Sequence, residues 1–384
     1  MAFISPLSDG PIVMRRYLLR LARRLLPGAL AVLAAAPAGA VDFHVAPGGR
    51  DGNPGTAALP FRTIGKAARV ATPGTRIIVS PGVYTEILET TASGTPDAPI
   101  AYISSTIWGA RIRTQGPDDH WSWTNRGNHV QIVGFDISGN GAGGIDNFGT
   151  HVQIVRNHVH HIPALGCTSN GGAGIAASNY TNTNVFISRN RVHDIGEFPE
   201  PCSRVHGIYF QHEGGRIANN IVYRVTGWGI HFWHAPLRIE IVNNLVFNNA
   251  KGGIGGGAGD GPYFDDPSKP ADQITVINNI AYDNGGIGIE EFGLTGTNNF
   301  YSNNLVSRNE KNWSLQHGIS HSETVAALPG FVRYDPDGNG DYRLRPDSPA
   351  IDRGTARGAP LVDYNGVTRP RGRAVDIGPF EFVP

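Results

Sequence analysis

Short runs of β-branched and aliphatic residues recur along the chain from residue 129 onward, separated by turns rich in Gly and Asn. Within the runs, apolar and polar residues alternate with period 2, which predicts strands rather than helices. Three kinds of run follow one another in fixed order. The first kind is a β-branched run, found at Val130–Val133, Val152–Val155, Val185–Ile187, Ile239–Val242 and Ile274–Ile277.

The second kind of run begins with an Asn, and the third opens with Gly-Ile. The Asn-led runs start at Asn157, Asn190, Asn220, Asn244, Asn279 and Asn304. The isoleucines of the third kind are Ile145, Ile175, Ile208, Ile230, Ile254, Ile289 and Ile319, spaced by 30, 33, 22, 24, 35 and 30 residues. A minimum near 22 with variable insertions indicates a solenoid of about seven coils, with loops inserted between short strands.

Three strands per coil predict a triangular solenoid, in which equivalent residues of adjacent coils lie about 4.8 Å apart. Each aliphatic signature then forms a continuous column of the core. The recurring Asn is expected to form a ladder in which each amide bonds the next coil at a sharp turn. Asn also tolerates the left-handed conformation that such turns require, so turn chemistry alone is a compatible interpretation.

Both ends of the chain carry recognisable segments: 45–56, 60–64 and 79–84 near the start, and 339–344, 348–352 and 376–378 near the end. Together with the coils, these segments resemble the right-handed parallel β-helix proteins of the pectate lyase-like superfamily. The resemblance implies an all-β, right-handed parallel β-helix and an activity on polysaccharides, as a lyase, a hydrolase or an epimerase. These motifs identify a fold better than an activity.

We expect one β-helix domain over residues 41–384, with coils at roughly 75–325. Apolar residues at helical spacing in Phe61–Ala71 predict a short helix that covers the N-terminal end of the stack. The irregular C-terminal cap, residues 326–384, includes a segment rich in Pro, Arg and Asp (346–384) that is expected to cover the other end.

Residues 1–40 have the form of a signal peptide, with a basic start, a short apolar stretch and the cleavage sequence Ala38-Gly39-Ala40. We therefore expect a secreted or periplasmic protein that is a monomer and has no membrane anchor after cleavage. The chain carries 32 basic and 32 acidic residues, and removal of the leader leaves 27 and 31, a net charge of −4. No basic excess points to nucleic acid.

The two cysteines, Cys167 and Cys202, are expected to form a disulfide, because the chain is predicted to be exported. They lie in insertions 163–173 and 196–205, which precede consecutive Gly-Ile strands. A further insertion, 255–273, follows such a strand. Loops on both flanks predict a groove whose floor is the Gly-Ile sheet.

If the isoleucines point inward, the residue after each points outward into the groove. The centre of the floor then carries Tyr209 beside His231, and Gly-rich residues after it leave room for a sugar ring. The predicted catalytic residues are Tyr209, His231, His212 and His234. The predicted substrate-binding residues are Trp233, Gln211, Trp228, His206, Arg204, Lys251, Glu290 and Phe292.

Cleavage of a uronate by β-elimination needs a cation for the carboxylate, a base for the C5 proton and an acid for the leaving oxygen. Tyr209 and His231 can supply base and acid, and Arg204, Arg238 or Lys251 the cation. A glycoside hydrolase instead needs two carboxyl groups about 5–9.5 Å apart. Asp146 and Glu290 are five coils apart, roughly 24 Å, so they cannot form such a pair. A partner carboxylate could still come from a loop or a strand end, where the sequence has Glu213, Asp260, Asp265, Asp266 and Glu291. A non-catalytic glycan-binding surface is the third possibility.

Two other features were considered as sites. The outward residues His160, His193, Tyr223, Phe247 and Tyr282 form a column without flanking insertions, which we interpret as a structural ladder. Asp335, Asp337 and Asn339 match the start of a calcium-binding EF-hand loop, but Pro346 stands where its last ligand should be. We interpret this loop as a turn of the C-terminal cap. Calcium is the one candidate cofactor that the sequence offers.

Overall fold

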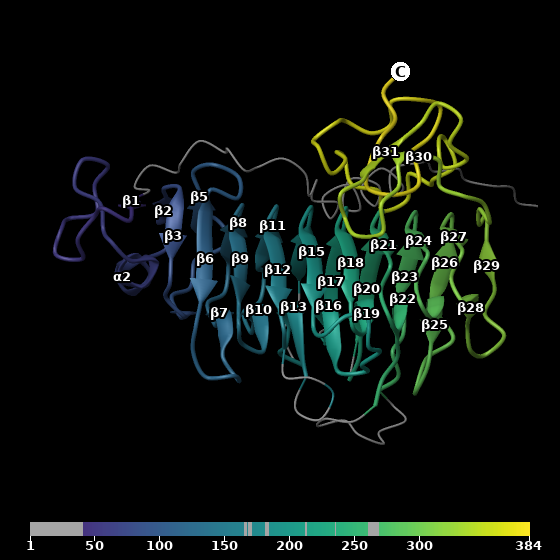
Figure 1. Cartoon of the computed structure of the whole chain (residues 1–384), viewed down its shortest axis with the longest axis horizontal. Helices are drawn as coiled ribbons and strands as arrows, with labels where there is room; N and C mark the ends of the chain where they lie inside the picture. The colour runs from purple at the N-terminus through teal and green to yellow at the C-terminus, as the bar shows by residue number, and fades with distance from the viewer. Residues whose placement is uncertain are drawn as a thin grey trace, which may run out of the picture.

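The computed structural model describes residues 41–164, 167, 171–180, 184–211, 213–234, 236–259 and 269–384. Within this part, three long parallel sheets run side by side along the molecule and form the three faces of a solenoid (Figure 1). We call them sheets A, B and C in the order in which each coil visits them. The predicted signal peptide lies outside the described residues.

Sheet A is formed by the β-branched runs. Its strands are β1 (Asp42–Val45), β2 (Arg76–Val79), β5 (Ile100–Ser104), β8 (Val130–Val133), β11 (Gln153–Val155), β14 (Val185–Ser188), β17 (Glu213–Ala218), β20 (Leu237–Val242), β23 (Thr275–Ile277), β26 (Phe300–Ser302) and β29 (His321–Ser322).

Sheet B is formed by the Asn-led runs and sheet C by the Gly-Ile runs. Sheet B contains β3 (Gly82–Tyr84), β6 (Ala110–Thr114), β9 (Asp136–Gly139), β12 (His158–Ile162), β15 (Arg191–Ile195), β18 (Ile221–Val225), β21 (Leu245–Phe247), β24 (Ile280–Tyr282) and β27 (Leu305–Ser307). Sheet C contains β4 (Leu88–Thr90), β7 (Trp121–Asn125), β10 (Gly143–Asn147), β13 (Gly172–Ala177), β16 (Val205–Phe210), β19 (Trp228–Phe232), β22 (Gly252–Gly256), β25 (Ile287–Glu291) and β28 (Lys311–Ser314).

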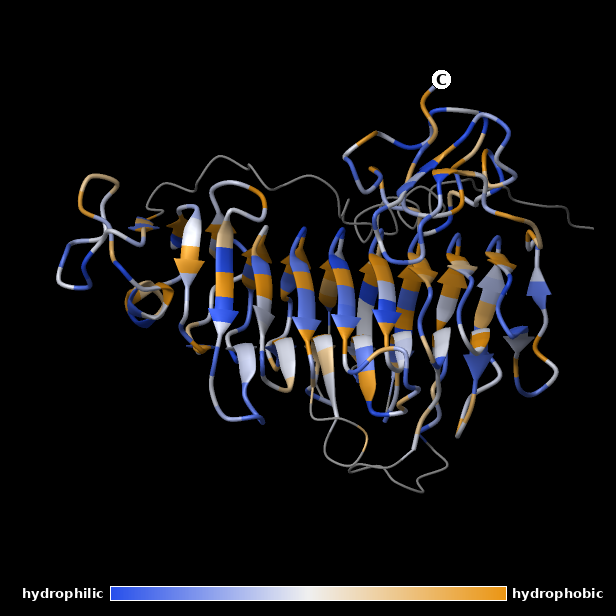
Figure 2. Ribbon diagram, viewed as in Figure 1, coloured by the Kyte–Doolittle hydropathy of each residue, from blue (hydrophilic) through white to orange (hydrophobic). Residues whose placement is uncertain are grey.

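The predicted register is confirmed over most of the stack. Ile208 of β16 pairs with Ile175 of β13 on one side and with Ile230 of β19 on the other. Hydrophobic and hydrophilic bands alternate along the strands (Figure 2), and the inward residues form one continuous core from Val45 to Val306. The last coil differs from the prediction, because Ile289 pairs with Trp313 of β28 and not with Ile319.

The stack also contains more coils than the seven expected. The described part of sheets B and C has nine strands each, because coils precede residue 129. Strands such as β5, β6 and β7 do not carry the recurring signatures of the later coils, so the sequence pattern does not reveal them. They bury Tyr102 and Trp123 instead of the aliphatic residues found in later coils.

The Asn ladder is present. The side-chain amide of each Asn donates to the Oδ1 of its counterpart in the next coil, with N···O distances of 2.9 to 3.2 Å, from Asn157 through Asn190, Asn220, Asn244 and Asn279 to Asn304. All six side chains are fully buried. A buried polar group is tolerated only when it is hydrogen-bonded, so the ladder fixes the coils in one register.

The predicted short helix is α2 (Ile64–Val70), capped by Thr63, whose hydroxyl accepts the N–H of Lys66. It buries Ile64 and Ala67 in the core at the first coils. No helix among the described residues is long and apolar enough to cross a bilayer.

The C-terminal segment is irregular apart from an antiparallel pair, β30 (Phe331–Arg333) and β31 (Asp341–Leu344). The sequence predicted that it covers the end of the stack. Its contacts instead run along the side of the later coils, where Phe331, Tyr342 and Ile377 pack on the outer face of sheet B (Figure 1). A second apolar cluster thus forms outside the solenoid, because sheet B carries Tyr223, Phe247 and Tyr282 outward.

Candidate active site

A cleft of about 1100 Å³ lies over sheet C. Eleven of the residues predicted for the site line it together: Arg204, His206, Tyr209, Gln211, Trp228, His231, Trp233, His234, Lys251, Glu290 and Phe292. His212, also predicted to be catalytic, lies outside the described residues. The gathering of these side chains follows from the register of sheet C, whereas their catalytic roles stay predictions.

The outward column of sheet C forms the floor of the cleft. Tyr209 pairs with Ala176 on one side and with His231 on the other, followed by Gly255 and Glu290. The rings of Tyr209 and His231 stack with centroids 5.2 Å apart and planes 10° from parallel. Stacking on adjacent strands holds both rings in a fixed relation, since neither can turn without disturbing the other.

His231 has a defined tautomer. Its Nδ1 lies 2.9 Å from the carbonyl oxygen of Gly255, and a carbonyl can only accept, so Nδ1 carries the hydrogen. Burial lowers the pKa of His231 to about 3, so the ring is neutral near neutral pH. Nε2 is therefore the nitrogen with the lone pair, and it can accept a proton.

His206 lies beside these two rings and lines the same cleft. Its ring centroid is 4.2 Å from that of His231 and 4.7 Å from that of Tyr209. Burial, with the neighbouring His231 as a second cause, lowers the pKa of His206 well below its ordinary value. Its Nδ1 has no hydrogen-bond partner among the described protein atoms. A second neutral imidazole therefore packs against the Tyr209–His231 pair.

An aromatic stack extends the floor toward the next coils. Phe292 stacks on Trp228 and on Trp233, each with a centroid separation of 5.0 Å. Trp228 in turn stacks on His231 at 4.8 Å. Flat apolar faces beside polar groups are the usual means by which proteins hold sugar rings, and these three side chains provide such a surface.

The Gly-rich coil does not leave the open space that the sequence suggested. A Cβ added at Gly255 would lie 2.7 Å from Nε1 of Trp228 and 2.8 Å from Cγ of Glu290. At Gly259, an added Cβ would lie 2.8 Å from the Trp233 ring. These glycines therefore make room for the tryptophans that flank the cleft, and not for a ligand directly.

The cleft carries both signs of charge. Burial raises the pKa of Glu290, and a hydrogen bond donated by Nε1 of Trp228 opposes that shift, as does the charge of Lys251. The Lys251 ammonium lies 5.2 Å from the centre of the Trp228 ring. Arg204 is exposed at the rim. Arg238 was also considered as a cation for the substrate, but it lies in β20 of sheet A, where it pairs with Glu213.

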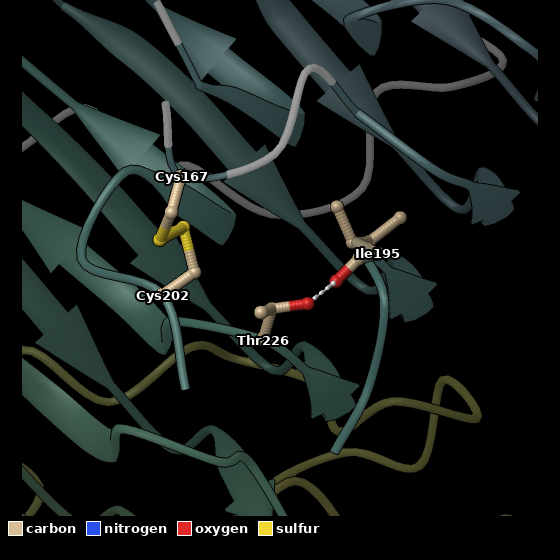
Figure 3. The surroundings of a disulfide bond; sticks show 4 residues. All are labelled: Cys167, Ile195, Cys202 and Thr226. Atoms are coloured by element: carbon tan, nitrogen blue, oxygen red, sulfur yellow. Dashed lines mark hydrogen bonds between the residues drawn. A yellow bond between two sulfur atoms is a disulfide. The ribbon is translucent and has the colours of Figure 1, made fainter. Parts of the chain in front are cut away.

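The predicted disulfide is present (Figure 3). Cys167 and Cys202 are joined with their Cα atoms 5.5 Å apart, which links the loops that precede β13 and β16. The backbone N–H of Cys202 donates to the carbonyl of Thr226, whose hydroxyl donates to the carbonyl of Ile195. Pro201, Ser203 and Arg204 beside Cys202 line the cleft, so the disulfide fixes the wall at this corner.

Sequence reasoning missed several lining residues. Glu310 is an exposed carboxylate at the edge of the cleft, just before β28. It was missed because the last coil had been placed around Ile319. Pro201 and Ser203 were missed because an irregular loop gives no periodicity from which to read a side-chain direction. Residues 260–268 of the insertion 255–273, which include Asp260, Asp265 and Asp266, lie outside the described residues.

The column also places the carboxylates considered for hydrolysis. Asp146, Ala176, Tyr209, His231, Gly255 and Glu290 are consecutive partners, so Asp146 and Glu290 are five coil steps apart, roughly 24 Å. Burial raises the pKa of Asp146 to about 6. The two groups cannot act on one glycosidic bond.

The loop considered for calcium packs against sheet B, away from the cleft. The Asp337 carboxylate accepts from Arg224, and an Asp335 carboxylate oxygen accepts the backbone N–H of Asp337. Arg333 donates to the carbonyl of Asn339. These bonds are those of a docked turn, and they engage the oxygens that a calcium ion would need.

Comparison with known proteins finds a family model and several relatives that match most of this chain. The family model described as "Pel9A-like, right handed beta helix region" matches residues 43–323. Pectate lyase L of Dickeya dadantii (strain 3937) and that of Dickeya chrysanthemi are each 22% identical over 396 residues, covering 88% of this chain and 90% of theirs. The crystal structure of pectate lyase Pel9A superposes with a TM-score of 0.65 at 18% identity, covering 88% of this chain and 96% of that one. This chain therefore belongs to the Pel9A-like right-handed β-helix family.

Proposed function

We propose that this chain is an exported polysaccharide lyase that cleaves a uronate-containing glycan by β-elimination in the sheet C cleft. The observation that carries the proposal is the stacked pair of Tyr209 and His231 on the cleft floor, with the hydrogen of His231 fixed on Nδ1. The similarity to pectate lyases supports the same reaction class.

In this reaction His231 Nε2 takes the proton from C5 of the uronate, and the electrons of that bond form the C4–C5 double bond. The bond from C4 to the glycosidic oxygen breaks, and the Tyr209 hydroxyl donates a proton to that oxygen. No water is consumed. The products are an unsaturated uronate and a new reducing end.

The low pKa of His231 makes it a weak base, and the charge of a bound anionic substrate would raise that pKa. A carboxylate within about 4–6 Å favours the imidazolium form and raises the pKa toward the working pH, where proton transfer is most efficient. Burial of the ring strengthens that effect, because a charge interaction is larger in a low dielectric. Lys251 and Arg204 supply positive charge for the same carboxylate.

Glycoside hydrolysis is the second candidate, favoured by the presence of two carboxylates, Glu290 and Glu310, in the cleft. Ile287 of β25 pairs with Lys311 of β28 in the next coil. The backbone of Glu310 is therefore one coil away from that of Glu290 and displaced by four residues toward the start of the strand. Their backbones are thus about 14 Å apart, which exceeds the 5–9.5 Å that two catalytic carboxyl groups require. Hydrolysis therefore needs both side chains to reach toward each other.

The experiment is to incubate the protein with a panel of uronate polymers, including polygalacturonate, and with neutral polymers as controls. We expect ultraviolet absorbance from the C4–C5 double bond to rise together with reducing ends, on a uronate polymer only. Reducing ends without that absorbance would show hydrolysis. Absence of both products across the panel, with retained binding, would show a glycan-binding protein.

The roles are tested by Tyr209→Phe and His231→Ala, with the exposed His317→Ala as the matched control. Removal of a general acid or base costs about 10²–10⁴-fold in rate, so we expect at least a 100-fold loss in kcat for the first two variants. His317→Ala should retain the parent rate. Full activity in both site variants, with unchanged circular dichroism, would refute the assignment.

A further inference from the structure

Four histidines gather on the outer face of sheet B, which is a different face of the solenoid from the cleft. His158, His160 and His161 come from β12, and His193 comes from β15 in the next coil, where it pairs with His160. One ring nitrogen from each of His158, His160 and His193 lies within 4.8 Å of the others. The sequence interpretation treated this column as a structural ladder, and His193 does stack on Tyr223 with planes 9° apart.

The hydrogen bonds of His158 and His193 leave two lone pairs facing each other. Nδ1 of His158 lies 2.8 Å from Oδ2 of Asp136, and Nδ1 of His193 lies 2.6 Å from Oδ2 of Asp194. An ionised carboxylate only accepts, so each Nδ1 carries a hydrogen. With the hydrogen on Nδ1, each ring turns its Nε2 toward the other ring, and these two Nε2 atoms are 2.7 Å apart.

Two facing lone pairs at this distance repel unless a cation lies between them. A shared proton is one solution, and a metal ion is the other. Two imidazole nitrogens on a tetrahedral ion with bonds of about 2.0–2.1 Å lie about 3.3 Å apart, so the two Nε2 atoms would separate by only about 0.6 Å. The carboxylate–imidazole–ligand arrangement is also the one that orients histidines at metal centres.

The surroundings allow an ion to enter and favour nitrogen ligation. A cavity of about 550 Å³, lined by His158, His193 and Asp337 among others, lies between sheet B and the C-terminal segment. Asp136 also accepts from Arg113, and Asp194 also accepts from Arg224. The two carboxylates are thus already engaged, which disfavours calcium or magnesium as hard ions. Imidazole suits zinc and related transition metals.

We propose that His158, His160 and His193 form a binding site for a divalent transition-metal ion of the zinc class, with Asp136 and Asp194 as the carboxylates that orient the rings. A bound ion would link strands β12 and β15 of two adjacent coils. Through Asp136 it would also link β9 of the coil before them. The site is independent of the proposed lyase reaction, because it lies on another sheet.

The test uses the full chain without a polyhistidine tag, treated with a chelator and then titrated with Zn²⁺ by calorimetry and with Co²⁺ by visible absorbance. We expect about one ion per chain and a Co²⁺ spectrum of a site with nitrogen ligands. Ca²⁺ should produce no comparable heat. Failure to bind Zn²⁺ with one-to-one stoichiometry would overturn the proposal and leave the shared proton as the explanation.

The variants are His158→Phe and His193→Phe, which keep an aromatic ring for stacking but remove the ligand nitrogen. Each should weaken Zn²⁺ binding at least 100-fold, and Asp194→Asn should weaken it 10–100-fold through loss of orientation. The matched control is His151→Ala, which removes an exposed histidine from another stacked pair, His129–His151. Affinity unchanged in His193→Phe, or lost equally in His151→Ala, would refute the site.

Discussion

Replacement of Asn220 by Leu tests the ladder that holds the coils in register. The Asn220 side chain is fully buried and makes four hydrogen bonds. Its Oδ1 accepts from the backbone N–H and the amide of Asn190, and its Nδ2 donates to the carbonyl of Ile187 and to Oδ1 of Asn244. Leu has a similar shape and makes none of them, so the packing changes little while the polar contacts disappear.

A buried hydrogen bond contributes roughly 1 kcal/mol net, so the four bonds amount to about 4 kcal/mol. One of the four is the bond from the backbone N–H of Asn190, which the substitution leaves buried without its side-chain acceptor. We expect the free energy of unfolding to fall by about 4 kcal/mol in urea titrations followed by tryptophan fluorescence, with an unchanged m-value. Asn365→Leu, at an exposed position, is the matched control. A loss below about 1 kcal/mol, or one equal to that of the control, would refute the reasoning.

Three further predictions concern the cleft and its wall. The pKa of His231 is about 3 in the folded chain and about 6.5 when unfolded, so the unfolded chain binds more protons between these values and stability is lost as the pH falls from 6.5 to 3. In urea titrations, His231→Phe should reduce that pH dependence by about 1.4 kcal/mol per pH unit, and an equal slope in both proteins would contradict the assigned pKa. The double variant Cys167→Ser, Cys202→Ser should lower the free energy of unfolding by about 3–4 kcal/mol, because the disulfide no longer restricts a loop of 35 residues in the unfolded chain. Calorimetry should show a lower melting temperature, and an unchanged one would contradict this prediction. Trp233→Ala should raise KM about 10-fold with a smaller effect on kcat, since Trp233 belongs to the stacking surface; a fall in kcat alone would place it in the chemistry instead.

The coils after residue 129 could be predicted because their signatures have direct physical causes. Only Asn completes the ladder at the turn, and the β-branched runs fill the core, so Ile208 and Ile230 could be aligned without a structure. That alignment alone brings Tyr209 next to His231. The family resemblance added the handedness, which strand patterns do not reveal.

The parts that could not be predicted depend on contacts between segments distant in sequence. Gly255 was interpreted as open space, although the Trp228 and Glu290 side chains of neighbouring coils approach its backbone. Glu310 was missed because Ile319 imitates the repeat in a turn after the true strand, β28. The C-terminal segment was placed over the end of the stack, because sequence patterns do not reveal that the outward rings of sheet B form an apolar surface for it.

The uneven coil length has a consequence for how such a protein can change. The step from Ile208 to Ile230 takes 22 residues and that from Ile254 to Ile289 takes 35, yet both pairs of coils keep the same strand pairing. Additional residues are accommodated in the corners and do not shift the sheets. Mutation can therefore lengthen, shorten or replace a corner loop, and so alter the walls of the cleft, while the rings on the floor keep their spacing. The walls and the floor can thus evolve independently of each other in this architecture.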